Sequence, residues 1–193
     1  MTGIGGDTDI IVSSENEELI LVDEDDNELG FLSKEQCHNG NGTLHRAFSV
    51  FIFNEDGDLL LQKRSAEKRL WPLYWSNSCC SHPRKGESME LATYRRLAEE
   101  LGIEAGLEFV YKFSYQAQFG GRGSENELCS VYLGKTDQSY TANRNEIVHA
   151  RYVSRELLER ELESNPDEFT PWFKMEWETL CGEYAAKLAD FSG

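Results

Sequence analysis

The chain lacks long hydrophobic runs and paired cysteine motifs. Its five cysteines are an odd number, and without a Cys-x-x-Cys pair they argue against the disulfide framework of a secreted protein. No run approaches the roughly 18 apolar residues that a membrane-spanning helix needs. The first residues also lack the basic and apolar regions of a signal peptide. We therefore expect a cytoplasmic protein that does not bind a membrane.

Basic residues are also scarce. Lys and Arg number 19 against 35 Asp and Glu, which gives a formal net charge of −16. Such a chain repels nucleic acid, so we expect no nucleic-acid partner. An anionic small substrate would need a local cluster of Lys and Arg within this negative field. Adaptation to high salt and an ordinary acidic surface both explain the charge.

The remaining composition is that of a folded protein. Hydrophobic residues make up 39% and aromatic residues 11% of 193 residues, which is too apolar for a disordered chain and enough for a sizeable core. No linker or repeat interrupts the sequence. We predict a single domain over residues 1–193, in which residues 1–9 form a loose tail.

The hydrophobic pattern predicts strands in the middle of the chain and helices inserted and appended. Strands at 47–53 and 59–64 are predicted to form a hairpin, and two more strands lie at 107–118 and 127–134. A helix is predicted at 87–101, with an apolar stripe of Leu91, Tyr94, Ala98 and Leu101. Thr170-Pro171 opens a final helix. The fold class is α+β, with a mixed sheet between helices.

Histidines and carboxylates form the first candidate site. His38 and His45 flank a Gly/Asn loop, His82 follows two cysteines, and Glu125 and Glu127 are two apart where the predicted strand at 127–134 begins. Such residues point to the same strand face, where two carboxylates need a cation between them to stay ionised. Three imidazoles and two carboxylates suit Zn²⁺, Mn²⁺ or Fe²⁺ better than Ca²⁺. The alternative is that these histidines are ordinary loop residues.

Two charged groups have both a structural and a functional interpretation. Arg96 and Glu100 are four apart in the predicted helix and form either a surface ion pair or a site at which Glu100 holds a metal and Arg96 meets a phosphate. The stretch from Arg64 to Arg69, with Lys68 between them, is the densest basic cluster. It is either a solvated face or a clamp for an oligophosphate.

The adjacent cysteines allow two interpretations as well. Cys80 is either a buried small hydrophobe or a thiol that exchanges a proton when a charged neighbour adjusts its pKa.

The segment "SHPRKGESMELATYRRLAEELGI" resembles a degenerate Nudix box, G-x5-E-x7-R-E-U-x-E-E-x-G-U, where U is apolar. Glu87, Arg95 and Glu99-Glu100 match the pattern, whereas Ser81 replaces the opening Gly. Arg96 stands where the box has a metal-binding Glu. This exchange of a carboxylate for a cation argues against diphosphate hydrolysis.

Four further motifs resemble the type I isopentenyl diphosphate isomerases, a family with the Nudix fold. They are "LHRAF", "WPLYWSNSCCSHP", "SENELC" and "FTPWFKM", and together they span most of the chain. The resemblance implies a Nudix-like α/β/α sandwich with a mixed β-sheet and additional C-terminal helices. It also implies isomerisation of isopentenyl diphosphate to dimethylallyl diphosphate in isoprenoid biosynthesis.

The resemblance assigns roles to particular residues. It implies a site for Mn²⁺, Mg²⁺ or Zn²⁺ made by His38, His45, His82, Glu125 and Glu127, and a Mg²⁺ that arrives with the diphosphate and is held by Glu100. The implied catalytic residues are Cys80, Glu127, Tyr115 and Trp172. Those implied to bind the diphosphate are Lys34, Arg64, Lys68 and Arg96. The expected partner is the small-molecule substrate, bound by a monomer or homodimer.

The implied reaction requires an acid and a base. The substrate alkene has no neighbouring carbonyl, so it must gain a proton at one carbon and lose one at another through a carbocation-like state. We interpret Glu127 as the donor and Cys80 as the acceptor. A Nudix hydrolase of nucleoside diphosphate derivatives and a non-catalytic metal-binding module are the alternatives.

Overall fold

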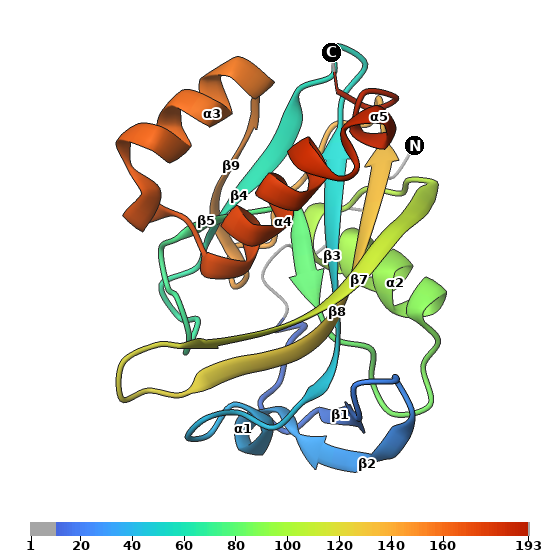
Figure 1. Cartoon of the computed structure of the whole chain (residues 1–193), viewed down its shortest axis with the longest axis vertical. Helices are drawn as coiled ribbons and strands as arrows, with labels where there is room; N and C mark the ends of the chain where they lie inside the picture. Colours follow the sequence, from blue (N-terminus) through green and yellow to red (C-terminus); the bar gives the residue numbers. More distant parts are fainter. Residues whose placement is uncertain (1–10, 193) are drawn as a thin grey trace, which may run out of the picture.

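The computed structural model describes residues 11–192, so the predicted tail at 1–9 lies outside the described residues. Within them, one mixed sheet of nine strands lies between helices (Figure 1). The strands are β1 (Glu18–Val22), β2 (Glu28–Ser33), β3 (His45–Phe53), β4 (Leu59–Arg64), β5 (Trp75–Ser76), β6 (Cys79–Ser81), β7 (Leu107–Gln118), β8 (Ser124–Lys135) and β9 (Ile147–Val153). The helices are α1 (Lys34–Cys37), α2 (Met89–Leu101), α3 (Arg155–Ser164), the 3₁₀ turn η1 (Pro166–Glu168), α4 (Pro171–Gly182) and α5 (Ala185–Leu188).

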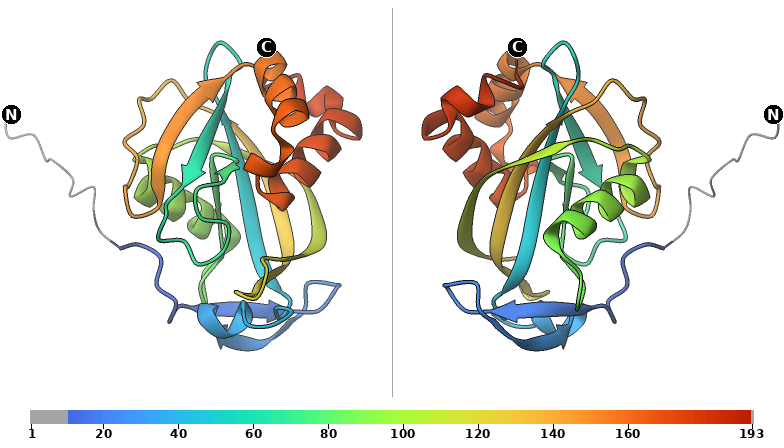
Figure 2. Two further views of the ribbon diagram at one scale, coloured as in Figure 1. Left: turned by 90° about the vertical axis from the view of Figure 1, so that its left-hand side faces the viewer. Right: turned by 90° about the vertical axis from the view of Figure 1, so that its right-hand side faces the viewer.

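Strand β3 is the centre of the molecule and has a hydrophobic core on each face. Phe48, Val50 and Ile52 belong to a core with α2, while the alternate residues Phe51 and Phe53 belong to a core with α4 and α5. Successive side chains of a strand point to opposite faces, so a strand buried on both sides is apolar throughout. Figure 2 shows α2 on one side of the sheet and the C-terminal helices on the other. The predicted α/β/α sandwich is confirmed.

The predicted hairpin of β3 and β4 is wrong beyond its turn. Phe53 pairs with Leu59, but β3 then runs parallel to β8 and β4 pairs with β9. The short strands β6 and β5, which the sequence analysis did not predict, pair with β3 and β4 respectively. Strands β3 and β4 therefore diverge beyond the turn, and each pairs with other strands along both of its edges. Their separation makes room for the segment that carries the two cysteines.

Helix α2 is confirmed, but its predicted buried face is not. The Ser88 side chain accepts a hydrogen bond from the Leu91 amide at the N-terminus, and Gly102 ends the helix at a left-handed φ of 64°. Leu91 and Tyr94 of the predicted stripe are 61% and 50% exposed. The side facing the sheet instead includes Arg96 and Glu100, both buried. The surface ion-pair interpretation of these two residues is therefore wrong.

Helix α4 begins at Pro171, as the Thr170-Pro171 signal predicted, and buries Trp172, Glu176 and Trp177. The predicted final helix is divided, because α4 ends at Gly182 and α5 begins at Ala185. No helix within residues 11–192 has the length and apolar character needed to span a bilayer.

Candidate active site

A cavity of about 770 Å³ is lined by residues of β6, β7, β8 and the start of α4, among others. Most of the predicted site residues line it: Lys34, His38, Arg64, Lys68, Cys80, His82, Arg96, Tyr115, Glu125, Glu127 and Trp172. His45 lies behind the wall, in contact with His38 and His82. Glu100 is also absent from the wall, because it is buried behind Arg96.

Strand pairing places the candidate residues on one face. Glu127 of β8 is opposite His45 of β3 in a parallel ladder and opposite Tyr115 of β7 in an antiparallel one. Cys80 of β6 is opposite Ser49, on the other side of β3. Since Ser49 is four residues from His45, both point to the same face. Cys80 and Glu127 therefore flank β3 and face the same cavity.

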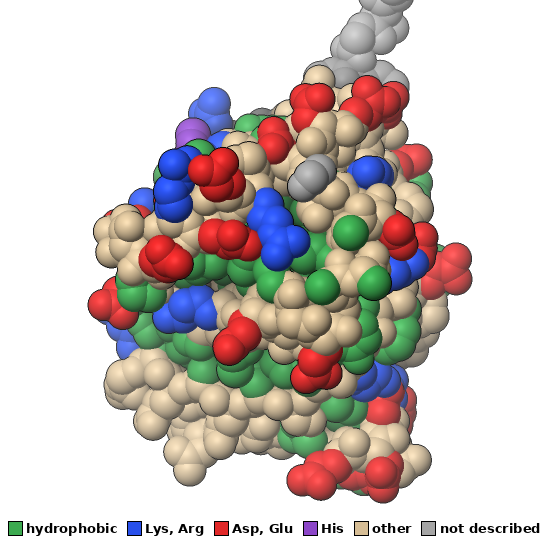
Figure 3. Space-filling view, turned by 45° about the horizontal axis from the view of Figure 1, so that its top comes forward, with side chains coloured by type: hydrophobic (Ala, Val, Ile, Leu, Met, Phe, Trp, Pro, Cys, Tyr) green, Lys and Arg blue, Asp and Glu red, His purple; other side chains and the backbone are tan. Residues whose placement is uncertain are grey.

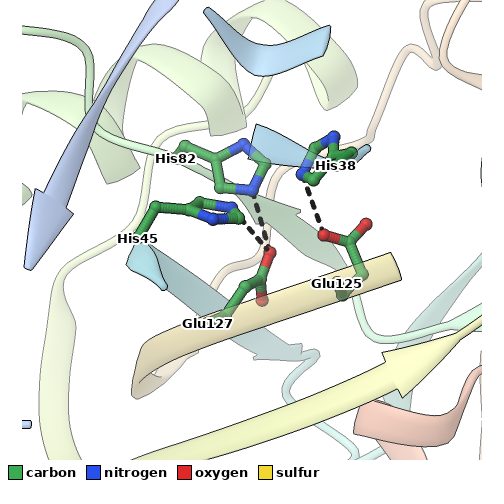
Figure 4. A group of neighbouring side chains, drawn as sticks. All are labelled: His38, His45, His82, Glu125 and Glu127. Atoms are coloured by element: carbon green, nitrogen blue, oxygen red, sulfur yellow. Dashed lines mark hydrogen bonds and ion pairs between the residues drawn. The ribbon is translucent and has the colours of Figure 1, made fainter. Parts of the chain in front are cut away.

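The five predicted metal ligands form one cluster (Figure 4). Their ligand atoms lie within 4.8 Å of one another, and all five residues are buried. His38 Nε2 is 2.9 Å from a Glu125 oxygen. His82 Nε2 is 2.8 Å from a Glu127 oxygen, and His45 Nε2 is 3.8 Å from that same oxygen.

These side chains fit a divalent cation. His38 Nε2, His45 Nε2 and one Glu125 oxygen are buried without a properly oriented hydrogen bond. The Thr43 carbonyl, 2.7 Å from His45 Nδ1, can only accept, so Nδ1 carries the proton and Nε2 keeps its lone pair. This arrangement around a ring nitrogen is typical of metal-binding histidines.

Burial sets the protonation of the cluster. It lowers the pKa of His45 to about 4 and that of His82 well below its usual value, which leaves neutral imidazoles, the form that binds metal. Burial and the Glu125 carboxylate raise the pKa of Glu127 well above its usual value. Burial also opposes ionisation of Glu125, but the neighbouring histidines, His38 first, bring the pKa of Glu125 below its usual value. The two carboxyl groups thus differ in acidity.

The adjacent cysteines point to different faces of the sheet. Cys79 is fully buried in the core against α2, whereas Cys80 packs against the other core and lines the cavity. Burial raises the pKa of Cys80 to about 12, against the opposing effect of Arg64. An Arg64 nitrogen lies 3.7 Å from Cys80 Sγ. Arg64 also donates to the carbonyls of Leu70 and Trp71.

Tyr115 and Trp172 complete the apolar end of the cavity. The Tyr115 hydroxyl donates to Glu127 at 2.6 Å. The Trp172 ring is buried, donates from Nε1 to Ser76 Oγ at 3.1 Å and has the Arg64 guanidinium 5.1 Å from its centroid. This end therefore offers a carboxyl group and a thiol within aromatic walls.

The opposite end of the cavity is basic. Lys34, Lys68 and Arg96 line it, and their ammonium and guanidinium groups already have partners. Lys34 donates to Ser13 Oγ at 2.5 Å. Lys68 is paired with Glu146, and Arg96 is paired with Glu100 and, at 3.2 Å, with Glu146. Three of the four proposed diphosphate-binding cations are brought together here, whereas Arg64 lies over the Trp172 ring.

Sequence analysis missed Glu146. It lies in a polar loop before β9, where nothing in its spacing sets it apart from the many other acidic residues. The burial of Arg96, from which an acidic partner could have been expected, is itself visible only in the structure.

Comparisons with known proteins indicate the family of this chain. The model of the NUDIX domain matches residues 43–173. The chain is 41% identical to isopentenyl-diphosphate Delta-isomerase 1 of Photorhabdus laumondii, over 89% of this chain and 99% of that protein. It is 44% identical to the isopentenyl-diphosphate Delta-isomerase of Serratia proteamaculans, over 82% of this chain and 88% of that one.

Solved structures share the fold. A protein from Deinococcus radiodurans superimposes with a TM-score of 0.63 at 23% identity, covering 77% of this chain and 90% of that chain. The MutT protein of Methanosarcina mazei does so with a TM-score of 0.60 at 20% identity, covering 73% and 95%. The match to the NUDIX model and the extent of identity to the isomerases lead to one conclusion: the chain belongs to the NUDIX domain family and, within it, to the isopentenyl-diphosphate Delta-isomerases.

Proposed function

We propose that Cys80 and Glu127 exchange the protons by which this isomerase converts isopentenyl diphosphate into dimethylallyl diphosphate. One observation carries the proposal: the two side chains come from strands on either side of β3 and face one cavity. A substrate lying over β3 would have a potential acid on one side and a potential base on the other. The aromatic walls would keep water from a developing cation.

The reaction needs one proton added and one removed. The Glu127 O–H bond breaks as a C–H bond forms at the terminal alkene carbon, which leaves positive charge on the tertiary carbon. A C–H bond of the CH₂ group between that carbon and the diphosphate-bearing carbon then breaks, its electron pair forms the new double bond, and the proton goes to the Cys80 thiolate. The Glu127 carboxyl group lines the cavity, which is the placement that a proton donor needs.

Neighbouring residues support this exchange. Tyr115 orients the Glu127 carboxyl through its 2.6 Å hydrogen bond. Burial favours the Cys80 thiol, whose pKa is about 12, so the acceptor form needs the adjacent Arg64 cation to stabilise the thiolate. Trp172 presents an aromatic ring, which stabilises a cation by about 0.5–2 kcal/mol.

Two divalent ions would bind at separate sites, one in the His/Glu cluster and one with the diphosphate. His38, His45, His82, Glu125 and Glu127 would hold a divalent ion, Mn²⁺, Zn²⁺ or Mg²⁺. This ion would neutralise the paired carboxylates and fix their orientation. Lys34, Lys68, Arg96 and Arg64 would bind the diphosphate, which arrives with Mg²⁺, and Glu100 would help to hold that Mg²⁺ from behind Arg96.

Two substitutions test the assignment. Cys80→Ala and Glu127→Gln should each lower kcat by about 1,000-fold or more, because each removes one proton carrier. Cys79→Ala is the matched control, since Cys79 faces the opposite core, and it should retain turnover. Thermal unfolding and metal content establish that each variant is folded. Near-normal turnover in either of the first two variants would refute the assignment.

A hydrolase of nucleoside diphosphate derivatives is the competing enzyme. Release of phosphate from a nucleotide panel, without isomerisation, would favour it. We also infer that the chain acts as one domain, in the cytoplasm, as a monomer or homodimer. Light scattering and cell fractionation test these inferences.

A further inference from the structure

Glu146 is a carboxylate on the cavity wall among the cations that would bind the diphosphate. It is 3% exposed, it is paired with Lys68, and one of its oxygens lies 3.2 Å from Arg96. Burial opposes its ionisation, but Lys68 and then Arg96 bring the pKa of Glu146 down to about 2. The side chain is therefore a permanent negative charge in the anion site.

The backbone around Glu146 is held in place. Its carbonyl accepts from the Ser65 amide at 2.9 Å, and its amide donates to the Asn143 carbonyl at 3.0 Å. Asn143 is in turn tied to the end of α2, since its amide donates to the Glu100 carbonyl at 2.8 Å. The carboxylate cannot leave the site by movement of its loop without the loss of these contacts.

The charges of the basic end are nearly balanced in the free protein. Lys34, Lys68 and Arg96 face the buried carboxylates Glu100 and Glu146, and Glu15 adds a further negative charge 3.6 Å from Lys34. A diphosphate that takes Lys68 and Arg96 as partners leaves Glu146 unpaired beside phosphate oxygens. Like charges at such short range repel strongly in a partly buried site. A divalent cation bound between the carboxylate and the phosphate removes this repulsion.

We propose that Glu146 makes capture of the diphosphate conditional on a divalent cation, so that the site accepts the metal–diphosphate complex and rejects the free anion. The inference rests on the proposed diphosphate site but not on the proton exchange. Glu146 is distinct in this role from Glu100, which is not on the cavity wall. It is a specificity-determining residue for the form of the substrate.

Binding of inorganic pyrophosphate tests the proposal without the isomerisation reaction. Isothermal titration calorimetry is run on the protein as purified, with and without added Mg²⁺, and metal content is measured afterwards to show that the His/Glu site is unchanged. The wild-type protein should bind about 100-fold more weakly without Mg²⁺. In Glu146→Gln the ratio of the dissociation constants without and with Mg²⁺ should fall below about 10, mainly because binding without Mg²⁺ becomes tighter.

Glu67→Gln is the matched control, because Glu67 also lines the cavity but is exposed. It should keep the wild-type ratio. The double variant Glu146→Gln/Lys68→Gln removes both members of the ion pair, and it should show the reduced ratio even if the single variant folds poorly. A wild-type ratio near one, or an unchanged ratio in the Glu146 variants, would overturn the proposal. If the binding ratios are as expected but the protein does not isomerise isopentenyl diphosphate, the proton-exchange assignment is refuted and the proposal on Glu146 stands.

Discussion

Glu176 is a carboxyl group buried in the core, on the face of α4 that also carries Trp172. Its side chain is fully buried in α4. One oxygen lies 3.6 Å from Cys129 Sγ, and the other is buried without a hydrogen-bond partner. Burial raises the pKa of Glu176 to about 8, and Ser49 and Cys129 offset only part of this. The folded protein thus holds a neutral carboxylic acid at physiological pH.

This pKa predicts a pH-dependent stability. The unfolded chain releases the proton near the ordinary value of 4.5, whereas the folded protein holds it until about 8. Raising the pH across this window therefore favours unfolding, and the free energy of unfolding falls. In Glu176→Gln the fall between pH 5 and 8 should be smaller by on the order of 2 kcal/mol, as measured by urea denaturation at several pH values.

The control for this prediction is Glu178→Gln, which removes a carboxyl group from an exposed position of the same helix. It should keep the wild-type dependence on pH. Equal dependence in Glu176→Gln and wild type would show that Glu176 does not hold its proton.

The proposed metal ligands come from separate parts of the chain. His38 ends α1, His45 begins β3, His82 follows β6, and Glu125 and Glu127 belong to β8. A bound ion would join these segments and leave fewer unpaired buried nitrogen and oxygen atoms. Since an ion that binds only the folded state stabilises it, its removal should destabilise the protein.

We expect a chelator to lower the midpoint of thermal unfolding by about 5 °C or more, and readdition of Mn²⁺, Zn²⁺ or Mg²⁺ to restore it. Differential scanning calorimetry measures the shift, and the ion that restores the midpoint at the lowest concentration is the one that the site binds most tightly. His82→Asn should unfold at a lower temperature and respond less to the chelator. His149→Asn, which alters an exposed histidine outside the cluster, should respond as wild type does.

The positions of helices and strands were easier to predict from the sequence than the elements against which they pack or pair. The helix predicted at 87–101 is found as α2, because its ends at Ser88 and Gly102 are set by capping, which is a local property. The prediction of the buried face of α2 was wrong, because the side that faces the sheet carries Arg96 and Glu100 and has a polar sequence pattern. The same limit applies to β3 and β4, whose turn is local but whose partners, β8 and β9, lie some 80 residues away along the chain.

Over the whole molecule, the net charge of −16 coexists with a site for an anion. Figure 3 shows acidic side chains distributed over one face rather than gathered in one patch. Lys34, Lys68 and Arg96, by contrast, converge on the cavity. The motifs of the sequence identified these residues by resemblance. The inward pairing of Lys68 and Arg96 with Glu146 depends on the tertiary fold, and no local pattern indicates it.

The central claim is that this protein moves protons between enzyme groups and an unactivated alkene. It is tested most directly by incubating the purified protein with isopentenyl diphosphate and Mg²⁺ in D₂O and analysing the product by NMR and mass spectrometry. Because the acidic groups of the cavity exchange with solvent, we expect dimethylallyl diphosphate that carries deuterium in its new methyl group. Dimethylallyl diphosphate without deuterium, or release of phosphate without any isomer, would contradict the account.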